Sequence, residues 1–166
     1  MNMHILNTTQ IHFDFIEDSI KANTVEDIFQ HVEAGLKNLD NKIRFRRIKK
    51  ILRLGHEETS YTIGNGVAVL NAKTFGVNRK VIGFLRLSKP VDFKADDGKQ
   101  CDLIAVILSP QNHGPLHLRR LSRVSRLLKD TKIVDKLREA EDVDVLKILL
   151  GSPDAADNSK EVAKAA

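Results

Sequence analysis

The segment Leu103–Leu108 constrains the fold of this chain more than any other, because its six residues are all Leu, Ile, Val or Ala. A strand with one face in water alternates apolar and polar residues, whereas a strand covered on both faces is apolar throughout. Val67–Leu70 and Val81–Leu87 are also apolar segments of strand-like composition. The sequence therefore predicts an α/β domain in which helices flank both faces of a sheet.

The segments between and after these strands have the periodicity of helices with one buried side. Thr24, with Asp27 three residues later, is typical of a helix N-terminus, and the apolar spacing beyond it predicts a helix over about residues 25–38. A second helix is predicted over about residues 41–54 and ends at Gly55, since glycine is common just past a helix. The other predicted elements are a short strand within Ile11–Ile20, a helix opening at Gly114–Pro115, a helix capped by Asp130 and a helix over 143–149 that Gly151 ends.

Length and composition indicate one domain. With 166 residues, 42% hydrophobic and 30% charged, the chain is large enough for a single core, which we assign to residues 1–150. Residues 151–166 lack large apolar side chains, so we expect a disordered tail there. The single cysteine, Cys101, excludes an intrachain disulfide and fits a buried, inert thiol. Since no membrane span or secretion signal is evident, we expect a location in the bacterial cytoplasm.

The segment Thr62–Lys73 contains Gly64-Asn65-Gly66 followed by Val67-Ala68-Val69-Leu70-Asn71-Ala72-Lys73. By itself, the pair of glycines predicts a tight turn before a strand, since a lone G-x-G is weak support for nucleotide binding. The segment nevertheless resembles the phosphohistidine signature of the fructose/mannitol-type enzyme IIA proteins of the bacterial phosphotransferase system, especially their nitrogen-related branch. Those proteins usually have I-G-x-G-[IV]-A-[IV]-P-H-[AG]-[KR], so Leu70-Asn71 stands in place of Pro-His.

The resemblance extends over roughly residues 5–150. Lys89–Phe93, Asp96–Gly98, Cys101–Pro110 and His117–Ser122 are similar, in order, to later motifs of the same family. The resemblance implies the fold of mannitol-type enzyme IIA, a single domain with a mixed β-sheet flanked by helices on both faces. It also implies a cleft in which the supporting His117 faces the phosphoacceptor-equivalent Asn71, lined further by Gly64, Asn65, Gly66 and Lys73.

The chemistry of Asn71 differs from that of the histidine it replaces. A neutral imidazole nitrogen is a nucleophile near pH 7, whereas the nitrogen lone pair of an amide is delocalised and cannot take a phosphoryl group. Two other positions depart from the family pattern: ungapped counting puts Gly55 where relatives have arginine, and Tyr61 where they have a small residue. We therefore expect Asn71 not to carry phosphate.

Other histidines offer an alternative route for phosphate. His117 and His56 have the chemistry of an acceptor, although a single histidine on a helix is more often a packed or solvated residue. His4, His12 and His31 lack the spacing of metal ligands, so the sequence predicts neither a metal nor a cofactor.

Two basic clusters are the other unusual feature of this chain, whose formal net charge is +5. Residues 42–53 hold seven basic side chains and no acid, and a second cluster follows His117. Such surfaces attract acidic proteins or nucleic acids, but the absence of tryptophan and the single tyrosine disfavour nucleic acid. The residues of a possible partner-binding face are Arg46, Arg47, Lys50, Arg119, Arg120 and Arg123.

The sequence thus supports two main hypotheses of function. The first is a regulatory protein on the enzyme IIA scaffold that docks, without phosphotransfer, onto a phosphocarrier protein, a kinase or a transporter. The second is an active phosphocarrier that uses His117 or His56. A basic nucleic-acid-binding domain is a minor alternative.

Overall fold

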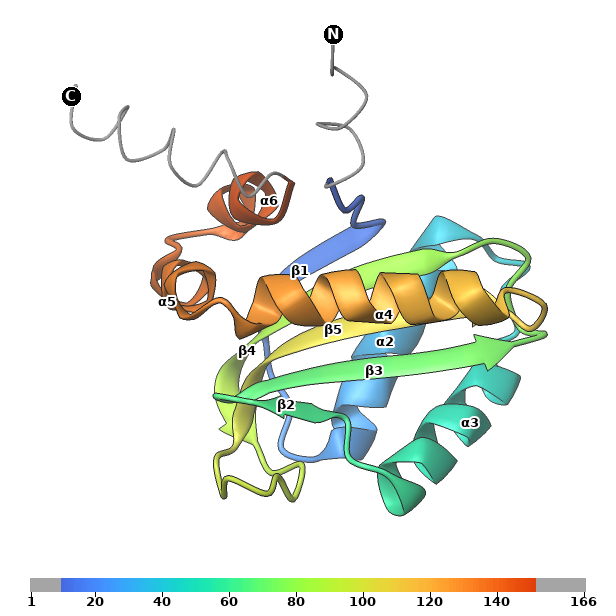
Figure 1. The fold of residues 1–166 in the computed structure, drawn as a ribbon, viewed down its shortest axis with the longest axis horizontal. Coiled ribbons are helices and arrows are strands. Elements are labelled where there is room, and N and C mark those ends of the chain that lie inside the picture. Colours follow the sequence, from blue (N-terminus) through green and yellow to red (C-terminus); the bar gives the residue numbers. More distant parts are fainter. Residues whose placement is uncertain (1–9, 152–166) are drawn as a thin grey trace, which may run out of the picture.

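The computed structural model describes residues 10–151 and contains a five-stranded mixed sheet (Figure 1). The strand order is β1-β4-β5-β3-β2. β1 pairs with β4 and β3 with β5 in parallel, whereas β4 with β5 and β2 with β3 are antiparallel. The predicted mixed sheet is confirmed. The strands are β1 (Phe15–Ile20), β2 (Thr62–Gly64), β3 (Val67–Thr74), β4 (Val81–Val91) and β5 (Cys101–Pro110).

Helices cover both faces of this sheet, as the apolar strands predict. On one face, α2 (Val25–Leu39) and α3 (Phe45–Glu58) pack on Leu70 and Ile104. On the other, α4 (Gly114–Lys129), α5 (Thr131–Glu139) and α6 (Val143–Gly151) pack on Val69 and Leu103 (Figure 1). None of the helices within residues 10–151 has the length and apolar composition needed to cross a membrane. The predicted tail lies outside the described residues, apart from Gly151.

The sequence signals at two helix starts are confirmed. The Thr24 hydroxyl accepts from the backbone N–H of Asp27 at 3.2 Å, and the Asp27 carboxylate accepts from the backbone N–H of Thr24 at 3.1 Å. Asp130 caps α5 by accepting from the N–H of Lys132 at 3.0 Å. Both caps satisfy amide groups that have no partner within the helix.

The predicted end of the second helix was wrong. α3 begins at Phe45 and continues through Gly55 to Glu58. A Cβ at Gly55 would lie only 1.9 Å from the Tyr61 hydroxyl oxygen, and that hydroxyl donates to the carbonyl oxygen of Leu52 at 3.1 Å. Gly55 therefore makes room for Tyr61 against α3, so its role is in packing and not in helix termination.

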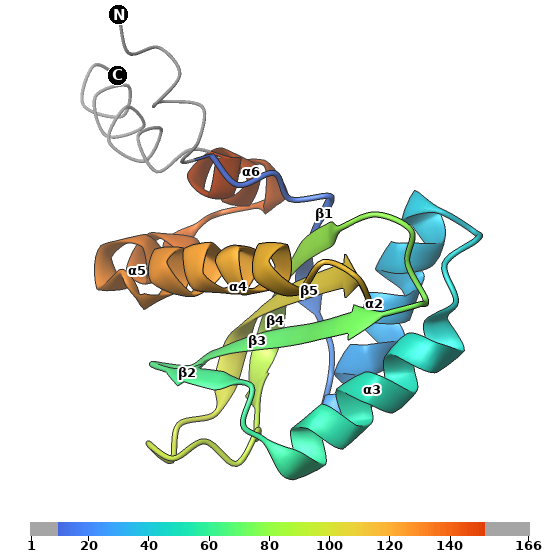
Figure 2. The same ribbon diagram turned by 45° about the vertical axis from the view of Figure 1, so that its right-hand side comes forward.

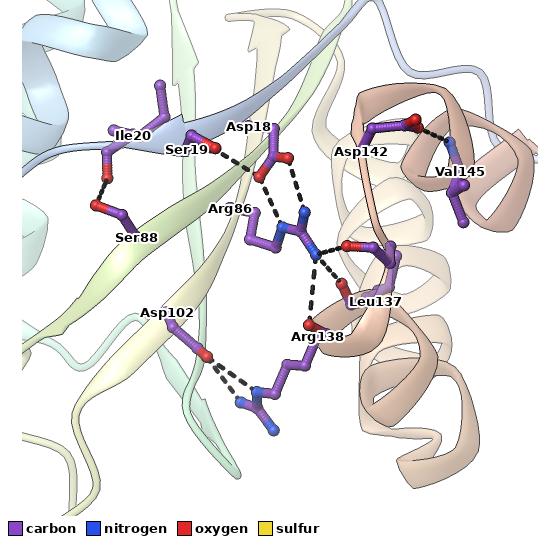
Figure 3. A network of polar contacts seen from close by, with 11 residues as sticks. Asp18, Ser19, Ile20, Arg86, Ser88, Asp102, Leu137, Arg138, Asp142 and Val145 are labelled. Carbon is purple, nitrogen blue, oxygen red and sulfur yellow. Dashed lines mark hydrogen bonds and ion pairs between the residues drawn. The ribbon is translucent and has the colours of Figure 1, made fainter.

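Arg86 of β4 joins the sheet to the C-terminal end of α5 (Figure 3). Its guanidinium donates to both carboxylate oxygens of Asp18 at 2.7 Å and to the carbonyl oxygens of Leu137 and Ala140 at 2.8 and 2.7 Å. The hydrogen bond from Arg86 is the main cause of the lowered pKa of Asp18. Since the last carbonyls of a helix carry partial negative charge, the guanidinium stabilises the end of α5 on the sheet.

Cys101 is buried at the start of β5, as predicted. Burial raises the pKa of its thiol to about 12. The thiolate form is therefore rare at neutral pH, which fits an inert packing residue.

Candidate functional site

β3 and the first turn of α4 bring Asn71 and His117 together. Side chains of a strand alternate between faces, and Val67 and Val69 lie under α4, so Asn71 points to the same side. His117 lies in the first turn of α4 and is 5% exposed. Its Nε2 lies 3.2 Å from Oδ1 of Asn71. The expected juxtaposition of these two side chains is present.

Hydrogen bonds around this pair assign a direction to each proton. Nδ2 of Asn71 donates to the carbonyl oxygen of Val69 at 3.2 Å, so Oδ1 is the atom that faces His117 and accepts from Nε2–H. Nδ1 of His117 then accepts from the Ser109 hydroxyl at 2.8 Å. Arg120 donates to the same hydroxyl oxygen at 2.8 Å. A continuous relay of donors thus runs from Arg120 through Ser109 and His117 to Asn71.

Burial favours the neutral form of His117. Burial is the main cause that lowers the pKa of the imidazole, and the positive charges of Lys73 and Arg120 lower it further. A neutral ring has one N–H donor and one acceptor nitrogen, which is the pattern that Asn71 and Ser109 require. Lys73 follows Asn71 by two residues on β3, so its side chain leaves the same face of the strand.

The side chains of Leu70 and Asn71 point to opposite faces of the sheet. Leu70 is fully buried with the α2 and α3 core. The N–H of Val69 donates to the carbonyl oxygen of Tyr61, on the β2 side of β3. Because backbone groups alternate in direction along a strand, the N–H of Leu70 faces β5, with which β3 pairs without interruption from Val67 to Thr74. Leucine supplies this backbone donor, which proline in the usual family motif lacks.

The glycine turn lies at the other end of β3. Gly64, Asn65 and Gly66 all have positive φ, of 94°, 55° and 75°, and form the tight turn between β2 and β3 that the two glycines predict. Asn71 is five residues further along an extended strand, about 16 Å away. The structure therefore does not bring the turn together with Asn71 and His117.

The turn contacts α5 and the β4–β5 loop instead. The Asn65 carbonyl oxygen accepts from Arg138, which also binds Asp102 at 2.8 Å, and the Asn65 N–H donates to Asp97 at 3.1 Å. A Cβ at Gly66 would lie 2.6 Å from the Arg138 guanidinium. These contacts give the turn a structural role in the fold.

Exposed apolar side chains lie close in sequence to both members of the Asn71–His117 pair. Phe75 follows β3 and is 71% exposed, and Leu116 and Leu118 in the first turns of α4 are 45% and 65% exposed. Lys73 lies on β3 between Asn71 and Phe75 in the sequence and is also exposed. We call Lys73, Phe75, Leu116 and Leu118 the α4 rim.

The two predicted basic clusters lie on opposite faces of the sheet. Arg46, Arg47 and Lys50 are exposed on α3, whereas the second cluster lies on α4. Within that second cluster, Arg120 is half-buried and bound to Ser109, so it belongs to the relay. Arg119 is exposed, and Arg123 donates to the Gln10 carbonyl oxygen at 3.2 Å. A single continuous basic face is therefore not formed.

His56 lies on α3, remote from the relay. Its ring packs edge to face on Phe93, with ring centroids 5.9 Å apart. The cavity beside it is lined by Arg53 but also by the acids Glu26, Glu57 and Asp92. Among residues 10–151, no cluster of histidine, cysteine and acidic side chains could hold a metal ion.

Sequence reasoning did not identify Ser109 as a site residue or Arg120 as part of the relay. The only signal for Ser109 was its position at the end of an apolar strand. The only signal for Arg120 was its spacing of three residues from His117, which puts both on one face of a helix.

The fold agrees with comparisons to known proteins. Residues 10–151 match the family model described as phosphoenolpyruvate-dependent sugar phosphotransferase system, EIIA 2. The chain belongs to this EIIA type 2 family. Among curated relatives, a nitrogen regulatory protein of Bradyrhizobium diazoefficiens is 31% identical over 138 residues, which covers 82% of this chain and 89% of the relative. The nitrogen regulatory protein of Escherichia coli is 30% identical over 135 residues, with coverage of 78% and 80%.

Solved structures show the same fold. The nitrogen regulatory protein IIA-Ntr from Neisseria meningitidis superposes with a TM-score of 0.69 at 24% identity, covering 82% of this chain and 92% of that one. The IIA mannitol protein of Escherichia coli gives a TM-score of 0.67 at 19% identity, with coverage of 81% and 94%. The expected mannitol-type enzyme IIA fold is confirmed.

Proposed function

We propose that this protein is a cytoplasmic regulatory protein of the EIIA type 2 family that docks onto partner proteins and does not transfer phosphate. One feature carries the proposal: the family resemblance places Asn71 at the usual phosphoacceptor position, and β3 presents its amide to His117. An amide donates and accepts hydrogen bonds but has no nucleophilic nitrogen for phosphoryl transfer.

The surroundings of His117 support the same conclusion. Both ring nitrogens are engaged, one by Asn71 and one by Ser109, and the side chain is 5% exposed. To accept phosphate, His117 would have to break one of these bonds and expose a buried ring, at the cost of leaving polar partners unsatisfied. A role in holding Asn71 in place requires neither step.

The α4 rim supports docking. Exposed apolar side chains gathered beside a polar site are typical of surfaces that bind other proteins. A solved complex of Escherichia coli enzyme IIA of mannitol with phosphorylated enzyme IIB of mannitol has this fold, with a TM-score of 0.69 at 18% identity. Several relatives are named nitrogen regulatory proteins, and we infer a regulatory role here as well.

Chemical-shift mapping tests the docking role. The ¹⁵N-labelled protein would be titrated with the purified histidine phosphocarrier protein of the phosphotransferase system, and we expect the largest shift changes at Lys73, Phe75 and Leu118. Leu118→Ser should weaken binding about tenfold, because the contact of an exposed apolar side chain with the partner is lost. Ile148→Ser is the matched control, since Ile148 is 52% exposed on α6, outside the rim. An unchanged spectrum at saturating phosphocarrier protein would contradict docking to this partner.

A further inference from the structure

The second half of β3 has an open edge. β2 pairs with β3 only through Thr62 and Gly64, and the last bond between the two segments runs from the Val69 N–H to the Tyr61 carbonyl oxygen at 2.8 Å. Beyond that point the chain leads back to α3. The rest of β3, which runs between α4 and α3, pairs with β5 on one side and has no strand on the other (Figure 2). β3 is therefore an edge strand from Asn71 onward.

The backbone groups on this edge follow from the alternation of a strand. Since the N–H of Val69 points to the β2 side, the N–H and carbonyl groups of Asn71 and Lys73 point there too. Among residues 10–151, no backbone hydrogen bond joins them to another segment on that side. The Val69 carbonyl oxygen accepts instead from the Asn71 side chain at 3.2 Å. Two donors and two acceptors thus remain in a row.

Side chains of both covering helices border this edge. On α4, Leu118 lies about 200° around the helix from Arg120, which binds Ser109 of the interior strand β5, so Leu118 is on the edge side. On α3, Lys49 and Arg53 pair with Glu26 of α2 at 2.9 and 2.6 Å. The opposite flank of α3, on the side of the open edge, carries Arg47 and Leu54.

The charge along this edge has one sign. Lys73 and Arg47 are exposed, and residues 42–53 and 111–129 contain no acid. The nearest acids on α3, Glu57 and Glu58, lie in its last turn, toward β2. A ligand along the open edge would therefore meet backbone donors and acceptors, basic side chains, and the apolar Leu118, Leu54 and Phe75.

We propose that the open edge of β3, from Asn71 to Phe75, binds an extended acidic segment of a partner protein as an added strand. This inference rests on the docking role proposed above and names the chemistry of the partner. An extended segment supplies alternating N–H and carbonyl groups, which a docked helix cannot offer to an edge. Its side chains alternate toward α4 and α3, so acids contact Lys73 and Arg47 while apolar residues contact Leu118 and Leu54.

A short synthetic peptide is the probe. An acetylated and amidated Glu-Val-Ile-Asp-Val-Glu peptide should bind with a dissociation constant below about 1 mM, measured by chemical-shift titration. The shift changes should centre on the amides of Asn71 and Lys73, with intermolecular nuclear Overhauser effects between strands. The charge-reversed Lys-Val-Ile-Lys-Val-Lys peptide should not saturate.

Two controls separate backbone pairing from charge. Lys73→Pro removes the N–H that points away from β5 and leaves the hydrogen bonds to β5 in place. It should weaken binding of the acidic peptide at least about tenfold. Lys73→Thr keeps the N–H and removes the charge. It should weaken binding of the acidic peptide about threefold, and the affinity should depend less on salt than that of the unchanged protein. The acidic peptide with alternate N-methylated amides tests the same bonds on the unchanged protein, and should also bind at least about tenfold more weakly.

The proposal would be overturned by equal affinity for the N-methylated peptide, by equal affinity for the basic peptide, or by shift changes away from β3. A concentration-dependent dimer that Lys73→Pro abolishes would show that the edge binds a second copy of this chain. That result would also overturn the proposal. The titration with phosphocarrier protein and the phosphorylation state are measured independently, so failure of strand addition leaves those two tests of the docking role unaffected.

Discussion

Nε2 of His117 donates to Oδ1 of Asn71 across 3.2 Å, and this bond connects the first turn of α4 to the open end of β3. The bond is one step in a relay that starts at Arg120 and passes through Ser109. Asn71, which the family resemblance places at the usual phosphoacceptor position, is a hydrogen-bonded partner in this network. The predictions below follow from that network and from the packing that supports it.

His117 should make the protein less stable in acid. Its pKa is lowered in the folded state, so below the unfolded value of about 6.5 the unfolded chain binds a proton that the folded chain does not. Stability therefore falls as the pH decreases from about 6.5 toward the folded pKa. Urea unfolding at pH 7.5 and 5.5 measures this loss. In His117→Gln the loss of unfolding free energy between these two pH values should be smaller. An unchanged loss would contradict the assignment of the acid destabilisation to His117.

Removal of His117 should also cost stability at neutral pH. His117→Ala leaves a cavity and removes the partners of Asn71 and Ser109, so we expect a loss of about 2 kcal/mol in the free energy of unfolding. His12→Ala is a suitable control, because the His12 side chain is 79% exposed and should change stability by less than about 0.5 kcal/mol. Equal effects of the two substitutions would argue against a buried relay.

Gly55 and Tyr61 should be coupled. Gly55→Ala would place a methyl group against the Tyr61 hydroxyl, and we expect a loss of at least about 2 kcal/mol. With Tyr61→Ala present, the same Gly55→Ala should stabilise α3 by about 0.5–1 kcal/mol, because alanine is the better helix former. A double-mutant cycle by urea unfolding measures the coupling, and simple additivity would show that the two residues do not clash.

Arg86 should hold α5 on the sheet. Arg86→Met removes the partner of Asp18 and three acceptor contacts at the end of α5, so we expect about 3 kcal/mol of destabilisation. Amide exchange in α5 should accelerate more than in α2. Adding Asp18→Asn should recover part of the loss, since the unpaired carboxylate is then neutral. Uniform acceleration in α2 and α5 would mean that Arg86 does not act locally.

Restoring the histidine alone should not restore activity. In Asn71→His, the preceding Leu70 and the Gly55–Tyr61 pair still differ from the usual family pattern, so we expect no phosphorylation of the variant by the upstream components of the phosphotransferase system. Radiolabelled phosphoenolpyruvate provides the readout, with an active relative labelled in parallel. Strong labelling of the single variant would show that the rest of the pocket is intact.

The sequence pattern predicted the sheet and the helices on both faces, and the family resemblance implied the approach of His117 to Asn71. Apolar strands such as Leu103–Leu108 and local caps such as Thr24 act over short stretches, so they can be recognised from nearby residues alone. The end of α3 was predicted wrongly because glycine often terminates a helix, whereas Gly55 here accommodates Tyr61.

Other features depend on tertiary packing. Arg86 and Asp18 are 68 positions apart, and nothing local in either segment indicates the pairing. The glycine turn was expected beside Asn71, but five residues of extended strand place it at the opposite end of β3, against Arg138. The two basic clusters resemble each other in sequence, although the sheet separates them and Arg120 is partly buried.

The most direct test of docking without phosphotransfer is the intact mass of the protein. It would be incubated with phosphoenolpyruvate, the general phosphotransferase enzyme and the histidine phosphocarrier protein, then measured under alkaline conditions that preserve phosphohistidine, beside an active relative. We predict no gain in mass while the relative gains one phosphoryl group. A gain of one phosphoryl group that His117→Ala or His56→Ala abolishes would contradict the account and identify the protein as a phosphocarrier with a relocated acceptor.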